Sequence, residues 1–185
     1  MLLDDNLFER AAAVQTPTGI LALAPKPAVA PRSLDAFQVV LEGLQDPGNV
    51  GAILRSAAAA GAAAAHLSSD CADPWSPKAL RGGMGAQFVI PAYQHEDLVA
   101  AVSALGLRLY GCTADAPICL FDADLRGKVG FIIGAEGAGI SAALRRQAHQ
   151  LLCIPMSEGM ESLNAAAAAS VIFYERFRQT RSQLN

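Results

Sequence analysis

Three polar, glycine-bearing segments of this chain carry side chains that a hydrophobic core does not need. The first contains Asn49 and Arg55, the second contains Glu136, and the third contains Ser162 and Asn164. A guanidinium group binds phosphate oxygens, and charge-assisted hydrogen bonds from amides and carboxylates hold such a group in place. These residue types therefore indicate a site for a polar or anionic ligand.

The third segment joins a polar loop to the longest helix that the sequence predicts, residues 162–178. Glu161, Ser162 and Asn164 lie at the junction, where N-terminal capping residues belong. The start of a helix presents unpaired backbone N–H groups and the positive end of the helix dipole. The alanines at 165–169 allow another backbone to approach closely. We expect the segments around Asn49 and Glu136 to meet this junction.

From residue 37 onward, apolar runs alternate with helical patterns. The predicted strands are residues 37–41, 63–67, 87–90, 107–112, 129–133 and 151–154. The predicted helices are residues 50–60, 78–84, 95–105, 141–147 and 162–178. This order predicts an α/β fold with a mostly parallel sheet covered by helices on both faces. Ligands of such sheets lie outside the carboxyl ends of the strands, so the loops after Leu41, Ile133 and Ile154 form the candidate site.

Residues 1–35 differ from the rest of the chain. Residues 15–19 are rich in turn formers, residues 20–24 predict one short strand, and three prolines between 25 and 31 predict an extended linker. We therefore expect residues 1–35 to be an N-terminal arm or the tail end of something missing, before a domain of residues 36–185. The acidic start is unlike a secretory signal, and the apolar runs are too short to span a membrane.

The composition limits the classes of function. The chain is 52% hydrophobic and 17% charged, which is typical of a globular protein, and its net charge is −3. A nucleic-acid partner must therefore be held by a local basic patch. The four cysteines form no CxxC pair, which predicts a reduced, cytoplasmic protein. His66, His95 and His149 have no ligand partners at metal-binding spacing, so we expect no metal.

The three segments resemble, in order and spacing, the three motifs of the SpoU-type (TrmH-like) RNA ribose 2′-O-methyltransferases of the SPOUT superfamily. They are residues 46–57, 132–140 and 154–164, the last ending in Ser-Leu-Asn before a helix. The resemblance spans roughly residues 37–179 and depends on all three motifs together. It implies a deep trefoil knot in the C-terminal part, bound S-adenosylmethionine, tRNA or rRNA as partner, and a homodimer formed through the knot region and the C-terminal helix.

The resemblance also implies which residues bind the cofactor. Gly134, Ile154 and Leu163 are expected to line it, with Thr113, Met156 and Ser162 close by. Strand-end loops of small residues suit this task, because an adenosyl group needs an apolar slot with a few backbone hydrogen bonds.

Arg55 is the residue that we expect to drive catalysis. Its pKa lies above about 12, so we expect it to clamp a phosphate and activate the ribose 2′-hydroxyl rather than to act as a base. Asn49 is expected to orient Arg55 or the ribose, and Glu136 to brace Arg55 or Asn164. Ser162 and Asn164 either contact the substrate side or cap the helix. The structural alternative for Arg55 is an ion pair with Glu136.

Binding of RNA requires cations outside the catalytic centre. Arg81, Arg145 and Arg146 are the candidates, although each of them alone is more typical of a solvated helix face. Trp75 lies in a proline-flanked loop, where it either stacks on a base or packs against the protein.

There are two alternatives to the methyltransferase function. A Rossmann-type oxidoreductase lacks support, because no G-x-G-x-x-G motif follows the first strand. The second is an RNA- or cofactor-binding module, or a catalytic fragment inactive alone. Many members of the family that the chain resembles carry an N-terminal RNA-binding domain, and residues 16–23 resemble only its closing strand.

Overall fold

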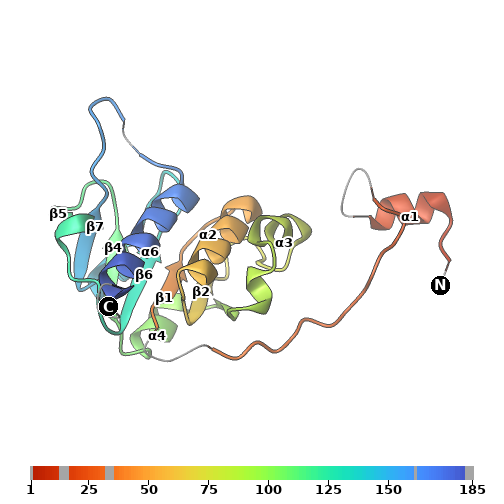
Figure 1. Ribbon diagram of the computed structural model, residues 1–185, viewed down its shortest axis with the longest axis horizontal. Helices are drawn as coiled ribbons and strands as arrows, with labels where there is room; N and C mark the ends of the chain where they lie inside the picture. The colour runs from red at the N-terminus through yellow and green to blue at the C-terminus, as the bar shows by residue number, and fades with distance from the viewer. Residues whose placement is uncertain (1, 13–16, 32–35, 161, 182–185) are drawn as a thin grey trace.

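The computed structural model describes residues 2–12, 17–31, 36–160 and 162–181 (Figure 1). Its centre is one sheet in the order β3-β2-β1-β6-β4-β7-β5, in which every paired neighbour is parallel. The strands are β1 (Gln38–Leu41), β2 (Ala64–Ser68), β3 (Ala92–His95), β4 (Arg108–Cys112), β5 (Ile118–Cys119), β6 (Val129–Ile133) and β7 (Gln150–Cys153).

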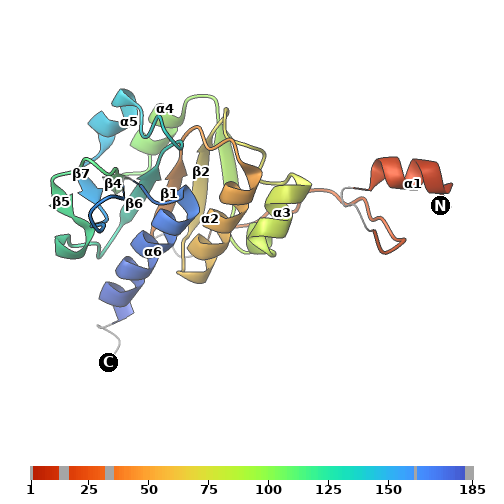
Figure 2. The same cartoon turned by 90° about the horizontal axis from the view of Figure 1, so that it is seen from above.

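Helices cover both faces of this sheet, which confirms the predicted α/β class. The α-helices are α1 (Asp5–Ala11), α2 (Pro47–Ala59), α3 (Pro77–Gly83), α4 (Leu98–Ser103), α5 (Ala142–Gln147) and α6 (Ala165–Arg181). Two short 3₁₀ helices are η1 (Ala86–Phe88) and η2 (Leu120–Asp122). Figure 2 shows α2, α3 and α6 on one face, with α4 and α5 on the other.

The central strands are buried on both faces, which explains their continuous apolar sequence. All four residues of β1 and all five of β6 are buried. Above them, Phe37 packs against Phe131 and against Phe173 of α6, with ring centroids 5.7 and 5.2 Å apart. Aromatic contacts of this kind add to the area that they bury. The last helix is thus fastened directly to the middle of the sheet.

The predicted strand at 87–90 is wrong. These residues form η1 and the turn after it, and the strand of this region is β3, which begins after Pro91. Gln87 is fully buried, and its Nε2 donates to the carbonyl oxygens of Pro74 and Ala79 at 3.0 and 3.1 Å. Gln87 reaches both carbonyl oxygens because the backbone here forms a compact turn. Local strand propensity does not reveal contacts with such distant residues.

The predicted helix starts also shift. The turn predicted at 46–49 is the first turn of α2, because the Asp46 side chain caps the Gly48 N–H and Pro47 fills the first helical position. The predicted helix 95–105 begins only at Leu98, since Asp97 accepts from the Ala100 N–H at 2.9 Å.

The N-terminal arm departs further from the prediction. Residues 20–24 form no strand, and helix α1, which was not predicted, buries none of its side chains. Part of the predicted turn, residues 15 and 16, lies outside the described residues. Lys26 lies 3.8 Å from Asp73, an exposed ion pair of small energetic value.

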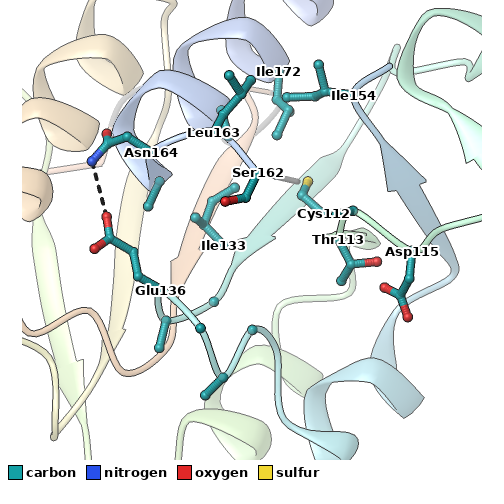
Figure 3. Close-up of a pocket in the computed structure, with 18 of the residues that line it drawn as sticks. Cys112, Thr113, Asp115, Ile133, Glu136, Ile154, Ser162, Leu163, Asn164 and Ile172 are labelled. Carbon is teal, nitrogen blue, oxygen red and sulfur yellow. Dashed lines mark hydrogen bonds between the residues drawn. The ribbon is translucent and has the colours of Figure 1, made fainter. Parts of the chain in front are cut away.

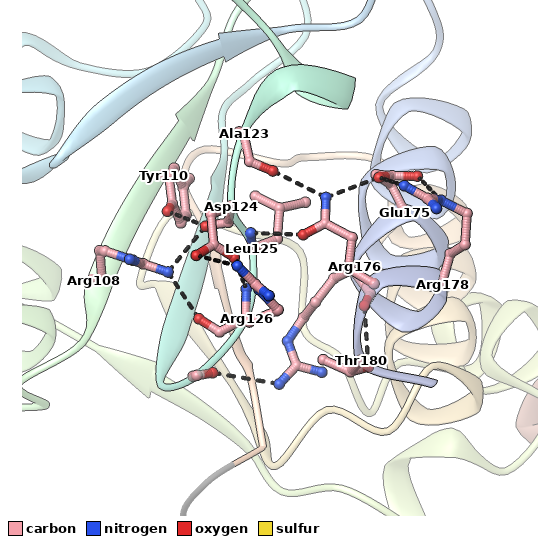
Figure 4. Close-up of polar contacts among 12 residues, drawn as sticks. Arg108, Tyr110, Ala123, Asp124, Leu125, Arg126, Glu175, Arg176, Arg178 and Thr180 are labelled. Atoms are coloured by element: carbon pink, nitrogen blue, oxygen red, sulfur yellow. Dashed lines mark hydrogen bonds and ion pairs between the residues drawn. The ribbon is translucent and has the colours of Figure 1, made fainter. Parts of the chain in front are cut away.

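A polar network holds the C-terminal half of α6 to the sheet (Figure 4). The Gln179 amide accepts from the Leu125 N–H at 2.9 Å, and it donates to the Ala123 carbonyl at 2.9 Å and to Glu175 at 2.8 Å. Each bond joins α6 to the segment before β6 or to its own preceding turn. With this end anchored, the N-terminus of α6 has a defined position at the opposite edge of the sheet.

Helices α2 and α3 approach so closely that only glycine fits at one position between them. A Cβ on Gly51 would lie 2.3 Å from the Ala79 carbonyl oxygen and 2.8 Å from the Gly83 nitrogen. Both of these atoms are backbone, so neither moves without shifting α3. By contrast, a Cβ on Gly48 would meet only the side chains of Asp46 and Lys78, at 3.2 and 3.3 Å.

We predict that Gly51→Ala lowers the free energy of unfolding by about 3 kcal/mol, because backbone overlap has no cheap relief. Gly48→Ala on the same helix is the matched control, with an expected change within about 1 kcal/mol. Urea denaturation of both variants measures the difference. Equal stabilities would contradict the close contact of α2 with α3.

His66 of β2 is a buried histidine with both ring nitrogens engaged. Nε2 lies 2.7 Å from the Gln38 amide oxygen and therefore carries the proton, and Nδ1 lies 3.0 Å from His95 Nε2. Burial, with a smaller contribution from His95, lowers the pKa of His66 to about 4 from an ordinary value of 6.5. This ring is therefore a structural element of the sheet.

We predict a loss of about 2 kcal/mol of unfolding free energy between pH 7.5 and pH 5. In this window the histidine of the unfolded chain, with a pKa near 6.5, becomes protonated, whereas the folded ring stays neutral until about pH 4. Lowering the pH therefore favours the unfolded state. Four carboxylates also have lowered pKa values, but they change the unfolding free energy mainly below this window. They are Asp46, Asp115, Asp124 and Glu175. Denaturation against pH, repeated with His66→Gln, measures the effect; an unchanged slope in the variant would rule out His66 as its source.

Candidate functional site

The loops after β4, β6 and β7 meet at the carboxyl edge of the sheet and line a cavity (Figure 3). The loop after β1, which was expected to form part of the site, does not line this cavity. Its volume is about 830 Å³, within the range of small-molecule sites. Its wall is formed by residues 112–115, 133–139, Arg145, Leu152, Ile154, Met156, residues 162–165, Ala168 and Ile172.

The loop after β6 is a tight backbone hairpin that forms one wall. Ala135 and Gly139 exchange two hydrogen bonds of 3.1 and 2.9 Å, and Gly137 adopts a left-handed φ of 85° between them. A Cβ on Gly134 would lie 2.2 Å from the Gly139 carbonyl atoms. Glycine is therefore obligatory at 134, and the wall offers backbone in place of side chain.

One carboxylate joins the three polar segments. Glu136 Oε1 accepts from Asn49 Nδ2 at 2.7 Å and from Asn164 Nδ2 at 3.1 Å. Asn164 Nδ2 also lies 3.1 Å from Asn49 Oδ1. Figure 3 shows the Asn164–Glu136 bond at the edge of the cavity. Three residues that were predicted to cooperate are therefore brought together.

Asn164 is also the capping residue of α6. Its Oδ1 accepts from the Ala166 and Ala167 N–H groups at 2.9 and 3.3 Å, and the helix starts at Ala165. The predicted start at Ser162 was therefore too early by one turn. Ser162 and Leu163 precede the helix and line the cavity. Glu161 lies outside the described residues.

Arg55 lies apart from this network. Its side chain is exposed on α2, it does not line the cavity, and no hydrogen bond or ion pair joins it to another residue within the described part of the chain. It follows Asn49 by six residues, a rise of about 9 Å along the helix. Of the two partners expected for Glu136, the carboxylate binds Asn164 and not Arg55. Asn49 also binds Asn164 and does not contact Arg55, so its expected role toward the ribose stays a prediction.

All six residues predicted to bind the cofactor line the cavity: Thr113, Gly134, Ile154, Met156, Ser162 and Leu163. The Thr113 hydroxyl oxygen is buried and meets no strict hydrogen-bond geometry among the described residues, although it faces the Asp115 carboxylate closely enough to lower the pKa of that group. A buried hydroxyl in this position has capacity for a further hydrogen bond to a molecule in the cavity. A cavity with an apolar wall, one buried hydroxyl that can form a further hydrogen bond, and exposed backbone groups of a hairpin suits a nucleoside-like ligand.

An ion pair at the cavity rim was missed by the sequence analysis. Arg145 lies 2.9 Å from Asp115, and both residues line the cavity. The Arg145 guanidinium, with a smaller contribution from the facing Thr113 hydroxyl, holds the pKa of Asp115 below its usual range. Asp115 follows the carboxyl end of β4, which is the signal that identifies it in retrospect. Arg145, predicted as an RNA contact, is thus engaged at the cavity.

The other two arginines predicted to bind RNA lie far from each other. Arg81 is exposed on α3 and Arg146 is exposed on α5, and these helices cover opposite faces of the sheet. Within one chain they form no common stripe.

Cys112 also lines the cavity, but burial raises the pKa of its thiol to about 12, so it is no nucleophile at neutral pH. In the described part of the chain, no three His, Cys, Asp or Glu side chains cluster as metal ligands. No helix among those residues is long and apolar enough to cross a membrane.

Residues 36–174 match the model of the SpoU rRNA Methylase family. An uncharacterized tRNA/rRNA methyltransferase of Synechocystis sp. is 40% identical to the chain, over 76% of the chain and 53% of the relative. A 23S rRNA (guanosine-2′-O-)-methyltransferase of Xanthomonas campestris is 37% identical, over 78% of the chain and 59% of the relative.

Among solved structures, the SpoU methyltransferase AviRb from Streptomyces viridochromogenes, in complex with the cofactor AdoMet, is similar to the chain. The TM-score is 0.74 and the identity 35%, over 82% of this chain and 60% of that one. The curated relatives above are longer: the chain spans between 53% and 59% of their length.

We predict that Asn164→Ala lowers the unfolding free energy by about 2 kcal/mol, because it removes both the α6 cap and the bonds to Glu136 and Asn49. Asn164→Ser keeps a capping oxygen and should lose about 1 kcal/mol. Urea denaturation of both variants separates the two contributions. If neither variant is destabilised, Asn164 has no structural role.

Proposed function

Because this chain belongs to the SpoU rRNA methylase family, we propose that it transfers a methyl group from S-adenosylmethionine to a ribose 2′-hydroxyl of rRNA or tRNA. The observation that carries this proposal is the meeting of three loops around one cavity of about 830 Å³, where the Glu136 carboxylate joins Asn49 to Asn164. No metal and no membrane enter the proposal.

The cavity residues fit the proposed cofactor. Ile154 and Leu163 would contact the adenosyl group, the hairpin at Gly134 would offer backbone groups, and the buried Thr113 hydroxyl would form a further hydrogen bond. Ser162 and Met156 would lie close by. When bound, the cofactor supplies an electrophilic methyl group on a sulfonium.

Arg55 is the proposed catalytic residue. An exposed guanidinium on α2, with no partner in the described part of the chain, is available to clamp the phosphate next to the target ribose. There it would stabilise the alkoxide that develops on the 2′-oxygen during an in-line displacement. Asn49 lies on the same helix, so the network of Glu136 and Asn164 would hold α2 in register with the cofactor loops.

We also propose a homodimer built through α6 and the loops around it. One side of α6 packs on its own sheet, while Ala167, Val171 and Tyr174 stay outward, the last two with exposed fractions of 36% and 50%. An exposed row of small and apolar residues on a helix that already touches α2 supports a contact with a second copy.

The remaining family properties are proposals of the same kind. They include the trefoil knot, which would involve the segment between β7 and α6. The match of residues 36–174 supports a catalytic domain of residues 36–185 behind an N-terminal arm of residues 1–35. Four free cysteines and an RNA substrate support a cytoplasmic location.

The test is methyl transfer from labelled S-adenosylmethionine to unmodified rRNA and tRNA transcripts, with calorimetric titration of the cofactor in parallel. We predict that Arg55→Ala changes cofactor affinity by no more than about two-fold and lowers transfer on the order of 10²- to 10³-fold. Lys128→Ala, which removes a positive charge before β6 at the opposite edge of the sheet, is the matched control.

Full transfer by Arg55→Ala would refute its catalytic role. Cofactor binding without any transfer, in the unaltered chain, would favour a binding module that is inactive alone. If the unaltered chain does not bind the cofactor, the methyltransferase proposal fails.

A further inference from the structure

A short stretch that follows α3 exposes apolar side chains that the proposed reaction leaves unused. Between residues 84 and 89, Met84 is 71% exposed, Phe88 59% and Val89 37%. Exposed apolar groups are common singly, but three within six residues, after a helix that packs on α2, indicate a binding surface. We name this stretch together with Trp75 the aromatic shelf.

The shelf is rigid. The rings of Trp75 and Phe88 meet edge to face with centroids 5.6 Å apart. Between them, the buried Gln87 amide donates to the carbonyl oxygens of Pro74 and Ala79 and so ties η1 to the Trp75 loop and to α3. An exposed aromatic surface held by buried hydrogen bonds is pre-organised for a partner.

Met84 adopts a strained backbone conformation that keeps it outside. It ends α3 with φ at 46°, and among the described residues it is the one non-glycine with a positive φ. Glycine is the usual residue at such a helix end, since a side chain there is strained. Strain of this kind is typical of functional positions.

The shelf adjoins the proposed catalytic helix. Met84 directly follows Gly83, whose nitrogen packs against Gly51 of α2. At the other end of α3, Lys78 lies 2.7 Å from Asp46, the capping residue of α2. The cations Lys78 and Arg81 are exposed on α3, the helix that leads into the shelf, and Arg55 is exposed on α2.

We propose that the aromatic shelf stacks unpaired bases of the RNA substrate next to the target nucleotide. The inference rests on the proposed function and narrows its substrate class to RNA with unpaired bases near the methylated ribose. Bases in a duplex are already stacked on each other, whereas unpaired bases present free faces to aromatic side chains.

Charge and shape favour this occupant. The chain has a net charge of −3, so RNA affinity requires local cations, and the helix that leads into the shelf carries Lys78 and Arg81 while the neighbouring α2 carries Arg55. Protruding side chains at the end of a helix suit flat bases, and base-on-aromatic stacking tolerates any sequence. A second copy of the chain, which we place on α6, is the alternative occupant that the test excludes.

Trp75 is the single tryptophan of the chain, so its fluorescence reports on the shelf directly. The probe is an unpaired oligoribonucleotide of about ten nucleotides, titrated into the full chain. The same oligonucleotide annealed to its complement and inorganic polyphosphate of equal charge serve as the comparison arms. We expect strong quenching by the unpaired strand, weak quenching by the duplex, and none by polyphosphate.

Two variants remove the shelf without disturbing the core. Phe88→Ala should weaken binding of the unpaired strand about ten-fold, and Met84→Gly, which also relieves the strained φ, should weaken it about three-fold. Phe121→Ala is the matched control, because Phe121 is 50% exposed and follows β5 at the far edge of the sheet. Thermal unfolding confirms that each variant is folded.

The inference is overturned if the strand binds without quenching Trp75, if polyphosphate quenches as strongly, or if Phe88→Ala and Phe121→Ala bind alike. A loss of dimer by Phe88→Ala in sedimentation would assign the shelf to self-association instead. Methyl-transfer assays distinguish failure of the shelf proposal from failure of the proposed function. If Phe88→Ala keeps full methyl transfer and unchanged affinity for the unpaired strand, only the shelf proposal is refuted. Absence of cofactor binding refutes the proposed reaction, and the quenching result still decides the shelf.

Discussion

The site depends on the Glu136 carboxylate, which accepts hydrogen bonds from Asn49 and Asn164 and so joins segments 87 and 28 residues apart. In turn Asn164 caps α6, whose far end the Gln179 network fastens to the sheet. One charged group thereby links the loop after β6 to the starts of two helices. Charge-assisted bonds are stronger than neutral ones, which suits a junction that must keep its shape while ligands come and go.

Close backbone approach is the second constraint. At Gly134 the backbone lies against Gly139 and forms a cavity wall without side chains, while at Gly51 the helices α2 and α3 touch backbone to backbone. The first contact shapes one wall of the cavity, and the second sets the distance between α2 and the aromatic shelf. Both contacts are possible only because glycine has no Cβ. The alanines that begin α6 also have small side chains, which allow other segments to approach this helix closely.

Two polar groups at the candidate site have capacity for further hydrogen bonds. The Thr113 hydroxyl is buried in the cavity wall, and Arg55 stands exposed on α2. At the opposite edge, the Gln179 amide is engaged with backbone groups and with Glu175, although Arg176 Nε is buried there without a hydrogen-bond partner among the described residues. The carboxyl edge of the sheet is thus built for binding and the amino edge for stability, as parallel sheets generally are.

The sequence pattern by itself determined the α/β class and the bounds of β6, because a buried parallel strand reads as a continuous apolar run. The six residues expected around the cofactor came from the resemblance of three sequence motifs to a family, and all six line the cavity. The tertiary structure alone decided the rest. Gln87 lies in a turn because distant carbonyls accept its amide, and Asp115 pairs with Arg145 across the cavity rim. Likewise Glu136 binds Asn49 and Asn164 and leaves Arg55 exposed. Local patterns record which side chains are buried, whereas the partner of a polar group depends on where the folded chain brings another one.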